Sequence, residues 1–328
     1  MRPGRRVFFA VLGVALLVAA FALARCDRSP ARPPARPATG AQPAPAGFAA
    51  SSPSAPVPGS PSPSRSVVPS SSVSSWPPAG SPVTSRKGVS AWSFDGVGTA
   101  LRQSGASWYY TWSTNHNGIT APHGVEFVPM IWGSASVTTS ALSQAKSAGR
   151  ELLGFNEPDL AAQANMTVDQ ALDLWPKLQA TGLELGSPAV AYGAADPGKW
   201  LDRFMTGVKA RGLRVDFITL HWYGADFRAG PATAQLKSYL QAVYQRYQKP
   251  IWLTEYALMS FNSGGASVPG QAQQAAFVTE STAMMDGLSY LKRYAWFALP
   301  ADPSKPSTGL YLPGPKATQV GLAYQAAR

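Results

Sequence analysis

Two short strings of the sequence each place a glutamate at the end of an apolar run. The first is Gly154-Phe155-Asn156-Glu157-Pro158-Asp159, and the second is Trp252-Leu253-Thr254-Glu255-Tyr256. Hydrolysis of an acetal needs an acid that protonates the leaving oxygen and a carboxylate that attacks the anomeric carbon or activates water against it. A single glutamate would as readily cap a helix or form an ion pair, but Glu157 and Glu255 at one site predict a glycoside hydrolase.

Polar side chains near the two glutamates are candidates for binding substrate and for holding charge. Asn156 precedes Glu157 and can donate to a sugar hydroxyl next to the reacting carbon. In the string His221-Trp222-Tyr223, His221 and Tyr223 share one side-chain parity, so both can point toward the same face of a strand. We expect one of them to hydrogen-bond Glu255 and hold it ionised. For His221, a structural role at the end of a strand is an equal alternative.

Four tryptophans fall at predicted strand ends, where their faces can stack on sugar rings. We expect contact with substrate above all from Trp92 and Trp132, and we expect Trp296 to form the floor of the site. Packing in the core or between strands is the alternative for every member of the set. The set is Trp92, Trp112, Trp132 and Trp296. Trp252 has the opposite parity to Glu255, which predicts that it packs against helices.

The elements that must position these residues alternate along the chain. Helical patterns at 168–181, 197–211, 232–248 and 271–288 separate several of eight short apolar runs. This alternation predicts an α/β fold of the (β/α)8 TIM barrel type, with its active site at the carboxyl ends of the strands. The apolar runs are 88–92, 107–112, 125–132, 151–156, 184–190, 217–223, 251–256 and 294–299. A doubly wound open sheet is the alternative, but no glycine-rich phosphate loop follows the first run.

The chain before the predicted barrel divides into two segments. Residues 1–24 join three arginines to the apolar run 7–24 and to Ala22-Leu23-Ala24, a pattern typical of a signal peptide, although the run is also long enough for an uncleaved membrane anchor. Residues 25–85 are rich in Pro, Ala and Ser, which predicts a disordered linker. We therefore expect an extracellular or cell-surface protein, secreted or tethered to the membrane through residues 7–24, with a catalytic domain at 86–328.

A net charge of +11 would suggest a nucleic-acid partner if it were spread over the whole chain. Residues 1–87 hold ten Lys or Arg and one Asp, which leaves 18 basic and 16 acidic residues from position 88 onward. Because this remainder is nearly neutral, we expect no nucleic-acid partner. The three histidines lack the spacing of a zinc site, and Cys26 is the single cysteine, so we expect no metal ion, no cofactor and no internal disulfide. Nothing in the sequence indicates an oligomeric state.

The region from 88 to 328 resembles the clan A glycoside hydrolases, and within them glycoside hydrolase family 128, whose glycosyl hydrolase catalytic cores act on β-1,3-glucans. The resemblance implies that Glu157 is the acid/base and Glu255 the nucleophile of a retaining endo-glycosidase that cuts a β-glucan polysaccharide or oligosaccharide. The two glutamate strings are its most specific part. The other matching strings are Gly-Val-Ser-Ala-Trp92, Tyr-Tyr-Thr-Trp112, Val-Pro-Met-Ile-Trp132, Gly-Ser-Pro188-Ala and His221-Trp-Tyr223.

Two alternatives stay open at the level of sequence. One is a clan A hydrolase or a transglycosylase that acts on another β-glycan, because groove shape and water access decide the outcome. The other is a noncatalytic protein that binds wall glycans in the same aromatic groove. The presence of both glutamates argues against the second alternative, since a binding protein needs no paired acid and nucleophile.

Overall fold

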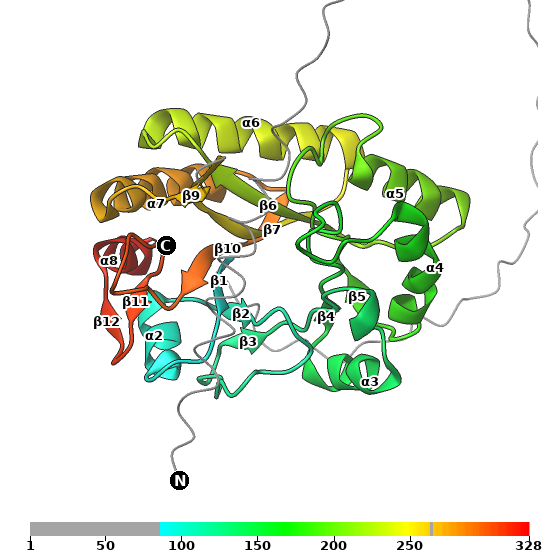
Figure 1. Cartoon of the computed structure of the whole chain (residues 1–328), viewed down its shortest axis with the longest axis horizontal. Coiled ribbons are helices and arrows are strands. Elements are labelled where there is room, and N and C mark those ends of the chain that lie inside the picture. The colour runs from blue at the N-terminus through cyan, green and yellow to red at the C-terminus, as the bar shows by residue number, and fades with distance from the viewer. Residues whose placement is uncertain (1–85, 263–264, 328) are drawn as a thin grey trace, which may run out of the picture. The chain divides into compact units, whose positions relative to one another are not determined.

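A computed structural model describes residues 86–262 and 265–327 of the chain. The predicted signal or anchor segment at 1–24 and the predicted linker at 25–85 lie outside the described residues. Within this part the protein has an α/β fold, with strands at the centre and helices around them (Figure 1). None of the helices at 86–262 and 265–327 is long and apolar enough to cross a membrane.

Six parallel strands form the main sheet, in the order β3-β2-β1-β10-β7-β6. Parallel neighbours need crossover connections, and the alternation of strands and helices along the sequence supplies them. The strands are β1 (Lys87–Ala91), β2 (Trp108–Tyr110), β3 (Glu126–Phe127), β6 (Ile218–Gly224), β7 (Ile251–Leu258) and β10 (Leu291–Leu299). Each of them overlaps one of the predicted apolar runs.

The two remaining predicted strands are present as short ladders. β4 (Glu151–Leu152) and β5 (Glu184–Leu185) pair in parallel with each other. Pro129 follows β3 and Pro188 follows β5, each still within the apolar run that predicted the strand. Neither proline has the backbone N–H that a continuous ladder requires, so the regular pairing stops early. Isolated parallel bridges continue the pairing at Met130–Leu153, Asn156–Ala189, Gly186–Phe217 and Val190–Leu220.

Helices follow most of the strands, and four of them match the predicted patterns. α4 begins with a capping box, in which the side chain of Thr167 accepts from the N–H of Gln170 and the Gln170 side chain accepts from the N–H of Thr167. The helices are α2 (Val97–Ser104), α3 (Thr139–Ala148), α4 (Val168–Gln179), α5 (Trp200–Ala210), α6 (Ala229–Tyr247), α7 (Gln271–Asp286) and α8 (Gln319–Ala326). A short 3-10 helix lies at Ser134–Ser136. Two pairs of short antiparallel strands are β8 (Ser260–Asn262) with β9 (Gly265–Ser267) and β11 (Tyr311–Leu312) with β12 (Lys316–Ala317).

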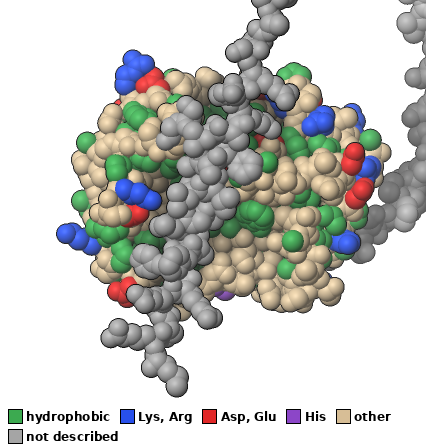
Figure 2. Space-filling model, in the orientation of Figure 1, with side chains coloured by type: hydrophobic (Ala, Val, Ile, Leu, Met, Phe, Trp, Pro, Cys, Tyr) green, Lys and Arg blue, Asp and Glu red, His purple; other side chains and the backbone are tan. Residues whose placement is uncertain are grey.

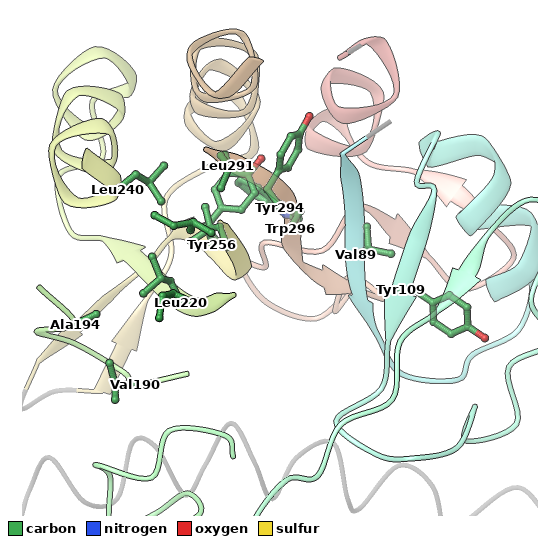
Figure 3. Close-up of a cluster of buried hydrophobic side chains, with 14 of the residues drawn as sticks. Val89, Tyr109, Val190, Ala194, Leu220, Leu240, Tyr256, Leu291, Tyr294 and Trp296 are labelled. Carbon is green, nitrogen blue, oxygen red and sulfur yellow. The ribbon is translucent and has the colours of Figure 1, made fainter. Parts of the chain in front are cut away.

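Buried apolar side chains form two clusters, and strand alternation assigns them to opposite faces of the strands. In β2, Tyr109 belongs to the larger cluster, which also includes side chains from the helices, whereas Trp108 and Tyr110 belong to the smaller one. Figure 3 shows part of the larger cluster, with Tyr256, Tyr294 and Trp296 on the strands near Leu240 of α6. The smaller cluster contains no side chain from a described helix. It therefore lies on the face of the strands that the helices do not cover.

One prediction about side-chain direction in β7 is wrong. Leu253 pairs with Leu220, but Glu255 pairs with His221, so Thr254 is an extra residue that shifts the register. Because of this bulge, Trp252 points to the same face as Glu255 instead of packing against helices. Its ring stacks on Phe217 at a centroid distance of 4.3 Å within the smaller cluster.

Candidate active site

Glu255 lies in the carboxyl half of β7 with 5% of its surface exposed. Three neutral donors point at its carboxylate. Trp112 Nε1 donates to Oε1 over 2.8 Å, and the hydroxyl of Tyr110 donates to the same oxygen over 3.0 Å. The hydroxyl of Tyr223 donates to Oε2 over 2.5 Å. These bonds fix the orientation of both oxygens and compensate for the burial of a negative charge.

The two tyrosines that contact Glu255 remain donors over the whole pH range in which proteins usually fold. Burial, the charge of Glu255 and the hydrogen bond with it raise the pKa of Tyr110 well above its usual value. Burial and the same charge also raise the pKa of Tyr223 well above its usual value. Neither hydroxyl therefore loses its proton near neutral pH, and both can respond to a change in the charge of Glu255.

Glu157 follows β4 in an uncommon backbone conformation. Its φ of 41° lies in the left-handed region, which costs a residue other than glycine about 1–2 kcal/mol. A hydrogen bond of 2.7 Å from its N–H to the carbonyl of Ala189 fixes the backbone here. Its side chain is 11% exposed, and Oε1 lies 2.9 Å from Nδ1 of His221. Strain at a fixed position of this kind is frequent at functional sites.

His221 lies between the two glutamates and is fully buried. Its Nδ1 is hydrogen-bonded to Glu157, and its Nε2 lies 3.5 Å from Oε1 of Glu255. Burial lowers the pKa of His221, but the charge of Glu255 and the hydrogen bond and charge of Glu157 outweigh it, so this pKa lies above its usual value of 6.5. These interactions favour the protonated ring, whose charge compensates for part of the negative charge of the pair.

The carboxyl groups of Glu157 and Glu255 lie close together. One oxygen of each and one ring nitrogen of His221 all lie within 4.8 Å of one another. Three such ligands can in principle hold a metal ion. The donors of Trp112 and Tyr223, however, occupy both oxygens of Glu255 and suit a bare carboxylate, so a metal ion would have to compete with them. The prediction that this chemistry needs no metal ion remains a prediction.

A group of aromatic rings lies beside Glu255. Trp92 and Trp112 stack at a centroid distance of 4.2 Å, and the ring of Phe297 meets both of them edge-on. Phe297 also meets Tyr223 edge-on at 5.6 Å. Trp92, Trp112, Tyr223 and Phe297 are all half-buried, so part of each ring remains accessible. Trp112 has φ 55°, and it is therefore, like Glu157, held in the left-handed region.

Two other predicted site residues lie nearby. Asn156 is buried, and its Nδ2 donates to Gln163 over 3.2 Å, whereas its Oδ1 has no hydrogen-bond partner among the described residues. This buried oxygen can therefore accept a hydrogen bond from a hydroxyl group of a ligand. Trp132 is half-buried and packs against the smaller apolar cluster, together with Trp112.

The structure does not bring Trp296 into this group. Trp296 is fully buried, contacts Phe277 of α7 and Tyr324 of α8, and donates from Nε1 to the carbonyl of Thr308. In the sheet it pairs with Val89, which also belongs to the larger cluster. The expectation that Trp296 forms the floor of the site is therefore wrong, because its side chain points to the helices (Figure 3).

Tyr110 and Phe297 were not predicted, although both contact the group. Tyr110 has the same parity as Trp112 in the run that contains β2, so parity alone was a signal for it. Phe297 follows Trp296 and therefore points to the opposite face of β10. Trp296 has the residue type expected to stack on sugars, but Phe297 is the residue of β10 that faces the glutamates.

Comparisons with known proteins identify the family of the chain. A family model described as glycosyl hydrolase catalytic core matches residues 89–324. A solved structure of a family 128, subgroup I, endo-β-1,3-glucanase from Amycolatopsis mediterranei with laminaritriose is 62% identical and has a TM-score of 0.71. The match covers 74% of this chain and 99% of that chain. The chain belongs to glycoside hydrolase family 128. The family prediction is thereby confirmed, and the protein is a glycoside hydrolase.

Two more distant relatives are also similar to this chain, and one of them is a solved family 128 structure. A subgroup II endo-β-1,3-glucanase from Sorangium cellulosum is 30% identical with a TM-score of 0.63, over 74% of this chain and 98% of that chain. Alkali-sensitive linkage protein 1 of Schizosaccharomyces pombe is 32% identical over 202 residues, which are 59% of this chain and 34% of that protein. The chain thus spans about a third of the length of this curated relative.

Proposed function

We propose that the protein is a retaining endo-β-1,3-glucanase. The observation that carries the proposal is the separation of at most 4.8 Å between a carboxylate oxygen of Glu157 and one of Glu255. Retaining glycosidases hold their two carboxyl groups about 5–5.5 Å apart, whereas inverting enzymes need about 6.5–9.5 Å to admit a water. The choice of a β-1,3-linked substrate follows the relative from Amycolatopsis mediterranei, an endo-β-1,3-glucanase whose structure contains laminaritriose.

In this proposal Glu255 is the nucleophile and Glu157 is the acid/base. Glu157 protonates the glycosidic oxygen while Glu255 attacks the anomeric carbon, so the leaving sugar departs as an alcohol and a glycosyl ester forms. Water then replaces the leaving sugar and gives a proton to Glu157. Attack of this water on the anomeric carbon breaks the ester and restores Glu255 with net retention.

The neighbouring residues have separate roles in the proposed cycle. His221 orients Glu157, and its own charge depends on Glu255, because the ionised nucleophile favours the protonated ring. Esterification of Glu255 removes that charge and therefore favours loss of the proton from His221. Sugar binding is assigned to the unpaired Oδ1 of Asn156 and to the accessible ring faces of the aromatic set, which consists of Trp92, Trp112, Trp132 and Phe297.

The fold that supports this site is proposed to be a closed (β/α)8 barrel. Parallel bridges extend from β3 to β4 and from β5 to β6, so eight segments pair in the order β1-β2-β3-β4-β5-β6-β7-β10 and β10 pairs with β1. The smaller apolar cluster would then fill the interior of the barrel. Glu157, His221 and Glu255 would lie together at the carboxyl ends of its strands, where active sites of this fold are found.

The proposal for the rest of the chain rests on the sequence. Residues 1–24 are proposed to act as a signal peptide or membrane anchor, residues 25–85 as a linker, and residues 86–328 as the catalytic domain. An exported or membrane-tethered enzyme at the cell surface would meet glucan outside the cell. Fractionation of cells that produce the chain tests this location, and activity found only in the cytoplasm would contradict it.

Two variants test the assignment of the glutamates. Glu157→Ala should retain the first step on a nitrophenyl laminari-oligosaccharide, whose leaving group needs little protonation, and azide should restore its turnover by replacing the activated water. Glu255→Ala should lose activity on that substrate, and azide should give a product of inverted anomeric configuration. Proton NMR identifies the first anomer formed by the unsubstituted chain.

The same experiments separate the proposal from its alternatives. An inverted first product from the unsubstituted chain would contradict the nucleophilic role of Glu255. Cleavage of β-1,4-glucan in preference to β-1,3-glucan would contradict the proposed linkage. Binding of laminari-oligosaccharides without cleavage of any glycan would instead identify a binding protein.

A further inference from the structure

We propose that a groove between α5 and α6 binds a polysaccharide that carries carboxylate groups, at a distance from the glucan site. This α5–α6 groove has a volume of about 1010 Å³, and it contains none of the residues of the glutamate site. The two helices lie next to each other in Figure 1, and a bond from Arg246 Nε to Asp202 Oδ1, 3.1 Å long, joins them. The charged residues that line the α5–α6 groove are Asp202, Lys209, Arg214, Asp216, Arg246 and Lys249.

The charge of the folded region is unevenly distributed, and this groove lies in its basic part. Residues 199–249, which contain α5 and α6, hold nine Lys or Arg and three Asp. The rest of 88–328 holds nine basic and thirteen acidic residues. On the uncovered part of the face in Figure 2, Lys and Arg lie around the edge, some beside acidic side chains, and form no continuous patch. By the residue counts, the basic excess is confined to 199–249, which favours a partner that contacts a limited area.

Ion pairs within the groove leave two of its cations available. Arg214 pairs with Asp216, and Arg246 pairs with Asp202, so each carboxylate of the lining already has a guanidinium partner. Lys209 is exposed and Lys249 is half-buried, and neither forms an ion pair with a described residue. Two lysines beside two neutralised pairs give the groove a net positive charge that an anion can compensate.

The groove and the glutamate pair lie toward opposite ends of the strands. Asp216 precedes β6, whereas His221 and Tyr223 lie in the carboxyl part of that strand. Asp216 lies five positions before His221, which corresponds to roughly 17 Å of extended chain. A neutral glucan bound at the glutamates therefore leaves the groove free, and the two sites can act on different chains of one wall material.

A carboxylate-bearing glycan fits the groove better than a nucleic acid. The volume of the groove is at the upper end of the range of about 300–1,000 Å³ for small-ligand pockets, and this space suits a few sugar rings. A duplex would extend beyond the groove onto surface where acidic residues outnumber basic ones. The two arginines of the groove, whose fork could clamp a phosphate or a carboxylate in two-point geometry, are already held by Asp216 and Asp202, so the free cations are lysines that act as point charges. Such point charges suit single carboxylates spaced along a polysaccharide chain.

The experiment measures binding of the full chain to polygalacturonate at low salt. Lys209→Gln with Lys249→Gln should weaken binding by roughly fivefold or more, and the corresponding Lys→Arg pair should restore it. Lys146→Gln with Lys177→Gln removes two exposed lysines from α3 and α4, outside the groove, and is the matched control, which should bind normally. Hydrolysis of laminarihexaose should be unchanged in all three pairs, so a failure of the glucanase proposal remains distinguishable.

Several outcomes would overturn the inference. One is an equal loss of polygalacturonate binding in the control pair, and another is undiminished binding in the groove pair. A third is equal weakening of duplex DNA binding in the groove pair, which would indicate a general polyanion surface. Tight binding to neutral dextran that depends on Lys209 and Lys249 would also contradict a role for carboxylate groups.

Discussion

The hydroxyl of Tyr223 and the carboxylate of Glu255 are joined across β6 and β7 by a hydrogen bond of 2.5 Å. Burial and the charge of Glu255 raise the pKa of Tyr223, so the tyrosine donates and the carboxylate accepts. When Glu255 forms a glycosyl ester it loses its negative charge, and this hydrogen bond must weaken. The bond therefore stabilises the free carboxylate of Glu255 relative to the glycosyl ester, and it limits how much ester accumulates during turnover.

Tyr223→Phe removes this donor and little else. We expect kcat on laminari-oligosaccharides to fall about 10–100-fold, because Glu255 regains its negative charge when the ester is hydrolysed and would then lack a charge-assisted bond, with a smaller change in KM. The Tm should change little. Tyr290→Phe is the matched control, since the Tyr290 hydroxyl has no hydrogen-bond partner among the described residues. An equal loss of kcat in both variants would contradict a specific role for Tyr223.

The stacked pair of Trp92 and Trp112 allows a test that separates hydrogen bonding from stacking. Trp112→Phe keeps an aromatic ring but removes the Nε1 donor to Glu255, and we expect it to lower kcat by about tenfold or more. Trp92→Phe keeps the stacking face, and we expect mainly a modest rise in KM. Steady-state kinetics on laminarihexaose would distinguish them. A larger kcat loss in Trp92→Phe would contradict the assignment.

The charge of His221 should depend on Glu255. Glu255→Gln removes the charge that opposes the effect of burial, so the pKa of His221 should move downward from its raised value. NMR titration of the imidazole measures this shift, and the chain has only three histidines to assign. His116 is the control: burial lowers its pKa, no charge of Glu255 is involved, and its titration should not change. An unchanged titration of His221 would contradict the proposed coupling.

A half-buried carboxyl group outside the site, that of Glu151, predicts a pH dependence of stability. The pKa of Glu151 is raised to about 7. Burial is the largest cause, the charge of Arg293 opposes it, and the charge of Glu126 adds to it. Because the folded pKa exceeds the unfolded value of 4.5, the contribution of Glu151 to stability is complete below about pH 4.5 and is lost as pH rises through 7.

Glu151→Gln mimics the protonated side chain and should remove this dependence. We expect the variant to exceed the unsubstituted chain in free energy of unfolding at pH 8 by roughly 1–3 kcal/mol, and to differ much less at pH 5. Urea denaturation at both pH values is the measurement. A variant that is destabilised equally at both pH values would show that Glu151 acts as an ion-pair partner of Arg293 in its charged form.

Sequence reasoning located Glu157, Glu255, His221 and Tyr223 together because parallel strands of one sheet present their carboxyl ends at one edge. The same reasoning failed for Trp252, since parity counting assumes an unbroken ladder and β7 contains the bulge at Thr254. Bulges arise from the pairing of strands that are distant in sequence, so no local pattern indicates them.

Other details depend on three-dimensional packing in a similar way. The short ladders of β4 and β5 could have been anticipated from Pro188, whose missing N–H is visible in the sequence. The hydrogen bond from Trp112 to Glu255 could not, because it joins residues 143 positions apart and requires a left-handed backbone at Trp112. Aromatic residues that sequence reasoning assigns to sugar stacking can thus have a second, polar role.

The left-handed backbone at Glu157 has an implication for how this chain tolerates change. Glycine is the residue type that adopts such a φ without cost, so replacing Glu157 with glycine would relax the local backbone. It would also delete the carboxyl group that the proposed chemistry requires. Selection for thermal stability alone and selection for catalysis therefore favour different residues at position 157, and a library screened only for heat resistance should enrich inactive glycine variants there.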